Sequence, residues 1–218
     1  MKKIFLFLSM IAAIGANAQG LTAGLRGGAS YWMQGGDKTN KPQTMRGQHI
    51  SPDVEAFVRR SRGKWAFEGA LGASALQYGM ADGMYFFECG NGISDFTTEI
   101  RNVDLTLSVQ RDITCPAMKS CPLLGRFRNY IGVSVTGAAT RSTARFINEN
   151  AGSDMSYTTY KFWTGVNNTL TFDLCKKTQI IATGYVRIVP TDFFSSYHFY
   201  EFNPVARAGV QLGGAYKF

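Results

Sequence analysis

The sequence has little charge and no long apolar run in its main part, and each shortage excludes a class of protein. Charged residues are 17% of the 218 residues, below the usual quarter of a soluble domain. Beyond Ile14 there is no stretch of about 18 consecutive apolar residues, so no transmembrane helix is predicted there. The cysteines lack a C-x-x-C spacing and there are only two histidines. The sequence therefore gives little support to a metal site, and we expect no cofactor.

The first residues have the pattern of an export signal. Lys2 and Lys3 form a basic start, Ile4–Ile14 is an apolar run, and an A-x-A sequence ends at Ala18. This order is typical of a secretory signal peptide, whose apolar run is too short to span a membrane. We therefore predict a signal peptide over 1–18 and a single domain over 19–218, exported by a two-membrane bacterium.

Apolar and polar residues alternate over most of the remaining chain. From Val103 to Val109 every second residue is Val or Leu, and polar residues fill the positions between them. The same period of two recurs from Ile131 to Val135 and from Val210 to Phe218. Such alternation predicts strands with one apolar and one polar face. The predicted strands are eight: Leu21–Met33, His49–Arg60, Lys64–Gln77, Thr97–Ile113, Phe127–Thr140, Thr159–Leu174, Gln179–Val189 and Glu201–Phe218.

The connections between these strands are mostly short at one end and long at the other. Ser61–Gly63 and Cys175–Thr178 are tight hairpins, whereas Thr114–Arg126 is a longer link on the same side. The long connections are Gln34–Gln48, Tyr78–Phe96, Arg141–Thr158 and Pro190–Tyr200. This arrangement is typical of transmembrane barrels. We predict an all-β fold, an eight-stranded antiparallel up-and-down transmembrane β-barrel with both termini on the short-turn side.

Alternation alone does not decide which face points inward. A soluble lipocalin-like carrier would turn its apolar face inward, and an outer-membrane barrel would turn it outward. Aromatic residues near both ends of the strands favour a lipid-facing apolar surface. The polar face mixes charges of both signs, which could form a paired network in the lumen. The residues of this predicted network are Arg26, Glu55, Arg59, Glu68, Asp104, Arg128, Lys161, Asp173, Arg187 and Arg207.

The last nine residues, Val210–Phe218, end on an aromatic residue and carry apolar residues at alternate positions. This segment resembles the C-terminal signal that the barrel-assembly machinery reads in outer-membrane proteins, with Tyr216 and Phe218 as its aromatic residues. The layout of the chain is similar to that of the small OmpA/OmpX-type barrels, the outer membrane protein β-barrel domain group. The resemblance implies insertion by that machinery into the outer membrane.

Four cysteines in an exported protein suggest disulfide bonds. Cys115 and Cys121 bracket one short-side link, and we expect them to pair. Cys175 lies in the neighbouring link and is the rival partner for either. Cys89 lies in a long connection at the opposite end. A zinc site is the other hypothesis for the short-side cysteines, although no histidine lies near them.

The long connections are rich in aromatic residues, and one of them carries the only candidate catalytic set. Ser196 and His198 would share a face of an extended segment, with Glu201 nearby. A Ser–His–Glu enzyme is therefore an alternative. The aromatic residues could instead form a recognition surface or pack on one another. This candidate surface comprises Tyr85, Phe86, Phe87, Phe193, Phe194, Tyr197 and His198.

These observations favour a non-enzymatic integral barrel with a side-chain-filled lumen, which serves membrane integrity or surface interaction. The alternatives are a lipid-modifying enzyme, a narrow pore and a soluble carrier. The net charge of +8 fits contact with anionic lipid or lipopolysaccharide better than with nucleic acid, because the basic residues are scattered along the strands. We expect a monomer, with a possible surface ligand of unknown identity.

Overall fold

The computed structural model describes residues 20–34, 45–47, 50–87, 90–121, 124–146, 155–190 and 204–218. Nearly all of them lie in strands. The strands are β1 (Leu21–Gln34), β2 (Met45–Gly47), β3 (Ile50–Arg62), β4 (Trp65–Phe87), β5 (Gly90–Asp112), β6 (Phe127–Phe146), β7 (Met155–Asp173), β8 (Thr178–Ile188) and β9 (Pro204–Lys217). The helical elements are α2 (Pro116–Lys119) and the single 3₁₀ turn η1 (Leu124–Arg126).

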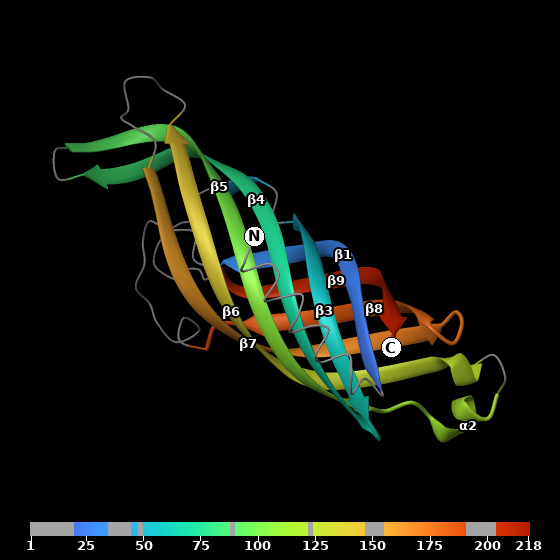
Figure 1. Ribbon diagram of the computed structural model, residues 1–218. Helices are drawn as coiled ribbons and strands as arrows, with labels where there is room; N and C mark the ends of the chain where they lie inside the picture. Colours follow the sequence, from blue (N-terminus) through green and yellow to red (C-terminus); the bar gives the residue numbers. More distant parts are fainter. Residues whose placement is uncertain are drawn as a thin grey trace, which may run out of the picture.

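The strands close into one antiparallel barrel. Each long strand pairs with its neighbour in sequence, β2 pairs only with β4, and β1 pairs with β9 to close the cylinder. Eight long strands therefore form the wall, as the sequence predicted (Figure 1). Closure pairs every long strand on both sides and leaves no open sheet edge along the wall. The described residues contain no helix long and apolar enough to cross a membrane.

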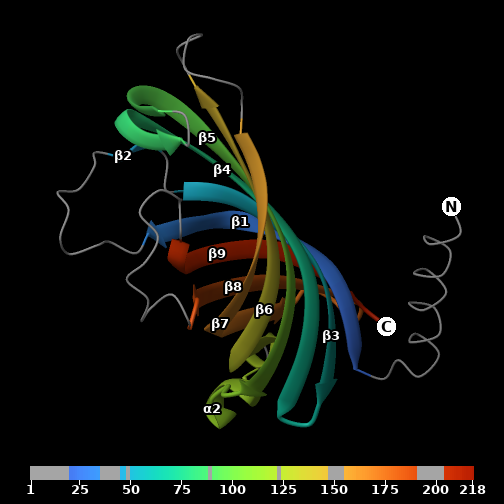
Figure 2. The same cartoon turned by 90° about the vertical axis from the view of Figure 1, so that its left-hand side faces the viewer.

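The two ends of the barrel differ. The end we call the turn end carries the short β3–β4 and β7–β8 hairpins, the start of β1, the end of β9 and helix α2. At the opposite end, which we call the far end, β4 and β5 continue beyond the other strands (Figures 1 and 2). Gly63 adopts a left-handed conformation (φ 61°) in the β3–β4 turn, which glycine accepts without steric cost.

Four predicted connections have a different structure. Gln34–Gln48 contains β2, and Arg141–Thr158 is partly strand because β6 runs to Phe146 and β7 starts at Met155. The segment Tyr78–Phe96, predicted as a loop, is largely a hairpin, because β4 runs to Phe87 and β5 starts at Gly90. The ladder shifts register between Met80 and Gly83, which allows the hairpin to continue past the barrel wall. The link Thr114–Arg126 contains α2 and η1, where Pro116 occupies the first helical position.

The apolar face of the wall points outward. Along β3, burial alternates strictly, with Glu55 3% exposed and Val54 53% exposed. β8 shows the same alternation, and Val133 on β6 and Leu212 on β9 are each 63% exposed. The interior holds the polar side chains. This orientation is opposite to that of a lipocalin-like carrier.

Candidate functional site in the barrel interior

The barrel interior contains a continuous chain of ion pairs. Arg26 on β1 binds Glu55 on β3 at 2.6 Å and Glu68 on β4 at 2.8 Å. Arg187 on β8 crosses the lumen to Glu55 at 3.0 Å. The side chains of all four residues are at most 5% exposed. Glu55 therefore joins an arginine on the adjacent strand β1 to an arginine on β8, which is three strands away from β3 in the sheet.

The same chain continues toward the far end. Asp104 on β5 lies 3.6 Å from Arg187 and 2.7 Å from Arg207 on β9. Arg207 also binds Asp53 at 3.2 Å. Arg187 and Arg207 are direct cross-strand partners, an arrangement of like charges that is unfavourable by itself. Asp104 lies within ion-pair distance of both guanidinium groups and offsets their repulsion.

Arg59 ends the ion-pair chain toward the turn end. Its Nη2 donates to Gln110 Oε1, its Nε lies 3.9 Å from Glu68 Oε2, and its guanidinium lies 4.3 Å from the Tyr130 ring. The complete set, which we call the lumen ion-pair chain, alternates in sign along its length. Its members in order are Arg59, Glu68, Arg26, Glu55, Arg187, Asp104, Arg207 and Asp53.

Two apolar layers interrupt this polar interior. The first consists of Phe57, Ala70, Ile181 and Ala215, and Phe57 lies 5.0 Å from the Arg26 guanidinium. The second lies toward the far end, where the Trp32 and Trp163 rings meet edge to face at 6.2 Å. Arg207 lies over the Trp32 ring at 4.6 Å. Phe57 thus lies within the charged segment, between Glu55 and Arg59 along β3, and the Trp32–Trp163 pair lies toward its far end. Both layers fill part of the lumen.

The structure places three residues of the predicted network elsewhere. Arg128 is half-buried at the turn end, where its Nη1 donates to the carbonyls of Gly125 and Phe127. Asp173 pairs with Lys217 and accepts a hydrogen bond from Gln179 at the same end. Lys161 lies in β7, half-buried, outside the lumen ion-pair chain. These residues share the polar face but sit at different heights.

Several interior residues were missing from the sequence prediction. Asp53 stands two positions before Glu55 on the same strand, so strand alternation already placed both on one face. Tyr185 likewise precedes Arg187 by two, and its hydroxyl donates to Asp53 Oδ2 at 2.5 Å. Trp32 continues the inward series of Arg26 and Ser30. Extending each alternation along the whole strand, through charged and uncharged residues alike, would have found all of them.

The structure shows no disulfide bond among the described cysteines, and the predicted pairing stays a prediction. Cys115 and Cys121 are not joined by a disulfide, and Cys175 is a free, exposed thiol. Helix α2 separates Cys115 from Cys121, whose backbone N–H donates to the Met118 carbonyl at the end of that turn. Cys89 lies outside the described residues. Among the described residues, no group of three or more metal-ligating side chains gathers.

Most of the predicted far-end site lies outside the described residues. Phe193, Phe194, Tyr197 and His198 lie outside the described residues, as do Ser196 and Glu201 of the candidate catalytic set and the predicted signal peptide. Tyr85, Phe86 and Phe87 belong to β4 and pair with Gly92, Asn91 and Gly90 of β5. The structure therefore places this part of the candidate recognition surface on the projecting hairpin.

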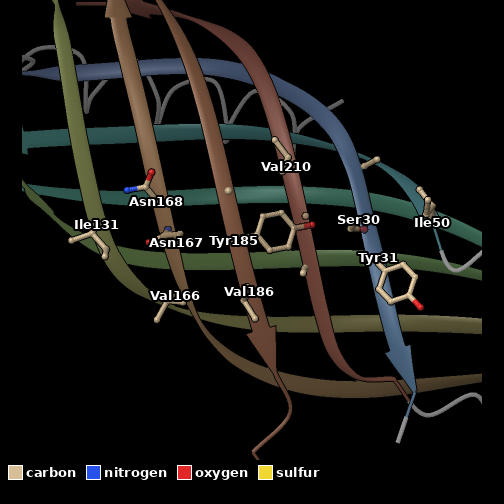
Figure 3. Close-up of a pocket in the computed structure, with 14 residues that line it drawn as sticks. Ser30, Tyr31, Ile50, Ile131, Val166, Asn167, Asn168, Tyr185, Val186 and Val210 are labelled. Atoms are coloured by element: carbon tan, nitrogen blue, oxygen red, sulfur yellow. The ribbon is translucent and has the colours of Figure 1, made fainter.

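The outer face carries aromatic residues near both ends and a hollow between them. At the turn end, Tyr216 and Phe218 pack at 5.1 Å, and Phe127 packs on Phe172 at 4.6 Å. Toward the far end, Tyr160 is 83% exposed. The hollow, of about 630 Å³, crosses β1, β9, β8 and β7. Figure 3 labels Tyr31, Val210, Val186 and Val166 on these successive strands.

The comparisons with known proteins identify the fold. No protein-family model matches the sequence, and no curated protein matches it. Neisserial surface protein A superposes with a TM-score of 0.53 at 10% identity, over 92% of this chain and 99% of that chain. A major outer membrane protein from Thermus thermophilus superposes with a TM-score of 0.52 at 12% identity, over 90% of this chain and 99% of that chain. The chain has the fold of the small outer-membrane β-barrels, and the predicted fold class is confirmed.

Proposed function

We propose that the protein is an integral outer-membrane barrel without enzymatic activity, whose lumen is closed by side chains and whose far end projects a hairpin for surface contact. The observation that carries the membrane placement is the inverted wall, with apolar residues outside and charges inside. Leu105 and Leu107 are 58% and 57% exposed, while Asp104 on the same strand is 3% exposed. Such a surface is stable in hydrocarbon and would aggregate in water.

The aromatic residues at both ends of the wall support the same placement. Trp65 and Tyr216 near the turn end are 48% and 44% exposed, and Phe162 toward the far end is 57% exposed. Amphipathic rings at the two water–lipid interfaces are expected of membrane barrels. The short hairpins and termini then face the periplasm, and the projecting hairpin faces outward.

The filled interior favours a closed barrel over a pore. Buried arginines and carboxylates occupy the centre, and Trp32 and Trp163 lie beyond them. An eight-stranded barrel leaves room for side chains but not for a wide channel. We expect planar bilayers containing the purified protein to show no discrete conductance steps. Regular unitary currents would favour the narrow pore instead.

The membrane placement is tested by extraction and by gel mobility. The protein in washed outer membranes is expected to resist urea and carbonate, and to migrate differently in SDS before and after heating. Both results follow from a closed barrel held in lipid. A protein that washes off and shows one mobility would contradict the proposal.

The surface role is tested on the projecting hairpin. Residues Gly83–Phe87 pair with Gly90–Ser94 and lie beyond the ladder that β5 forms with β6. Replacing 83–94 by Asn-Gly gives a two-residue turn that suits a hairpin. The shortened protein is expected to fold with unchanged SDS mobility behaviour but to lose binding of cells to surfaces coated with host or bacterial glycans and proteins. Equal binding by both forms would contradict a surface role of this hairpin.

A further inference from the structure

A second cavity lies inside the turn end, next to the Arg59 end of the lumen ion-pair chain. Its volume is about 590 Å³, and its walls come from the turn-end residues of β1, β3, β6, β7, β8 and β9. Arg59 and Tyr130 lie on its inner side, and Asp173 and Lys217 line it nearer the turns. We call it the mouth cavity. About half of its lining surface is polar, whereas the lining of the outer hollow is almost entirely apolar.

The charges of the mouth cavity are unbalanced. Five of its lining residues are cations, Arg59, Arg128, Lys176, Lys177 and Lys217, and Asp173 is the one carboxylate side chain among the described lining residues. Lys217 already pairs with that carboxylate. Even where Phe218 supplies a terminal carboxylate, positive charge exceeds negative charge around this space.

The lumen ion-pair chain provides the contrast. Its four arginines meet four carboxylates, so the centre of the barrel is neutral and has no need of an added ion. Arg59 belongs to that chain through Glu68 and presents no free charge of its own. The excess at the mouth cavity therefore rests on Arg128, Lys176 and Lys177, and the ammonium of Lys177 also lies 5.8 Å from the centre of the Tyr216 ring.

We propose that the mouth cavity binds a phosphate group, carried by a free phosphate or by the headgroup of an anionic phospholipid. Guanidinium and ammonium groups form charge-assisted hydrogen bonds with phosphate oxygens. The hydrogen bonds from Arg128 to the Gly125 and Phe127 carbonyls both use Nη1, so its Nε and Nη2 take no part in them. The cavity has the volume for a phosphate with its hydration water, and partial enclosure strengthens each charge interaction.

The first test measures pyrophosphate binding by calorimetry, using the folded full-length barrel in uncharged maltoside micelles at low salt. The wild-type protein is expected to bind at one saturable site. The double variant Lys176→Gln/Lys177→Gln is expected to bind about tenfold more weakly. The matched control is Arg62→Gln/Lys64→Gln, which removes the same charge from the neighbouring hairpin outside the cavity lining. It is expected to bind within about twofold of wild type.

The second variant tightens binding, a result that structural damage would not imitate. Asp173→Asn removes the carboxylate that competes with phosphate for Lys217. Its affinity for pyrophosphate is expected to rise about fivefold or more. Circular dichroism and thermal midpoints establish that each variant is folded. Absence of tightening in a folded Asp173→Asn protein, or equal weakening in the control, would overturn the proposal.

A lipid titration separates the two sources of phosphate. Micelles doped with phosphatidylglycerol are compared with micelles doped with phosphatidylcholine, and the ³¹P line width reports bound headgroups. Saturable broadening with phosphatidylglycerol that Lys176→Gln/Lys177→Gln reduces would assign a lipid headgroup. Binding of pyrophosphate alone would assign a free phosphate. Failure of both probes would overturn the site without affecting membrane insertion, which is tested by extraction.

Discussion

At the scale of single residues, each buried charge of the lumen ion-pair chain lies close to at least one residue of opposite charge. Glu55 accepts from Arg26 Nε at 2.8 Å and from Arg187 at 3.0 Å. A buried ion pair is weak evidence for net stability, because desolvation offsets much of the attraction. Removal of one partner is different, since it leaves the remaining charges buried without compensation.

The first prediction follows from this asymmetry. Glu55→Ala would leave two arginines without their shared carboxylate, and we expect a loss of about 3–5 kcal/mol in the free energy of unfolding. The matched control is Glu99→Ala, which breaks the exposed pair with Arg101 at 2.7 Å and should cost less than about 1 kcal/mol. Guanidinium unfolding from lipid vesicles measures both. Similar losses in the two variants would show that burial does not matter here.

Two adjacent glycines give the second prediction. A Cβ added at Gly213 would lie 2.0 Å from the Leu25 carbonyl oxygen and 2.6 Å from Arg26 Cα, whereas one added at Gly214 would meet nothing within 4 Å. Gly213 therefore permits the close approach of β9 and β1. We expect Gly213→Ala to abolish most of the folded, heat-modifiable band and Gly214→Ala to preserve it. Equal amounts of the folded band for the two variants would mean that β9 and β1 move apart easily to accommodate the added methyl group.

At the scale of elements, the β7–β8 turn carries a reactive thiol. The β7–β8 turn, Leu174–Lys177, exposes a cysteine next to two lysines. A hydrogen bond from the Thr178 hydroxyl, with smaller contributions from backbone groups and Lys217, holds the pKa of the Cys175 thiol below its ordinary value. The turn thus presents a thiol that ionises readily.

The third prediction concerns this thiol. Alkylation proceeds through the thiolate, so its rate rises with pH and reaches half its maximum at the pKa. In a background with Cys89, Cys115 and Cys121 changed to Ser, Thr178→Val should move that midpoint to higher pH. Iodoacetamide rates across a pH series measure it. An unchanged midpoint would show that the Thr178 hydroxyl does not stabilise the thiolate.

At the scale of the whole molecule, one cylinder separates two environments. The band of exposed leucine and valine residues belongs to the outside, and the paired charges belong to the inside. Closure allows this inversion, because every long strand finds a partner on both sides. A soluble protein of the same composition would have to reverse the two faces.

The fourth prediction compares two outward-facing residues at different depths along the barrel wall. Leu105 lies near the middle of its strand and Ile113 lies at the turn end, and they are 58% and 48% exposed. Leu105→Arg is expected to lower the free energy of unfolding in lipid by ~2–4 kcal/mol, and Ile113→Arg by ~0–1 kcal/mol. Folding titrations into vesicles measure both. Equal and negligible costs would indicate a wall that faces water.

The sequence by itself determined the strand number and the residues that share each face, because the period of two is a local property of extended chain. Arg26, Glu55 and Arg187 were placed on one polar face in this way. Only the tertiary structure decided that they meet, since Glu55 and Arg187 are 132 residues apart in sequence and come together across a closed lumen.

The tertiary structure also decided several features that the alternation of apolar and polar residues does not determine. The direction of the polar face depends on closure, and the projecting β4–β5 hairpin depends on pairing of a segment rich in glycine. The position of Trp32 and Trp163 in the interior runs against their apolar character, because the phase of each strand, rather than hydrophobicity alone, sets the side to which a residue points. The sequence determines a pattern along the chain, and the closed barrel determines which parts of that pattern come into contact.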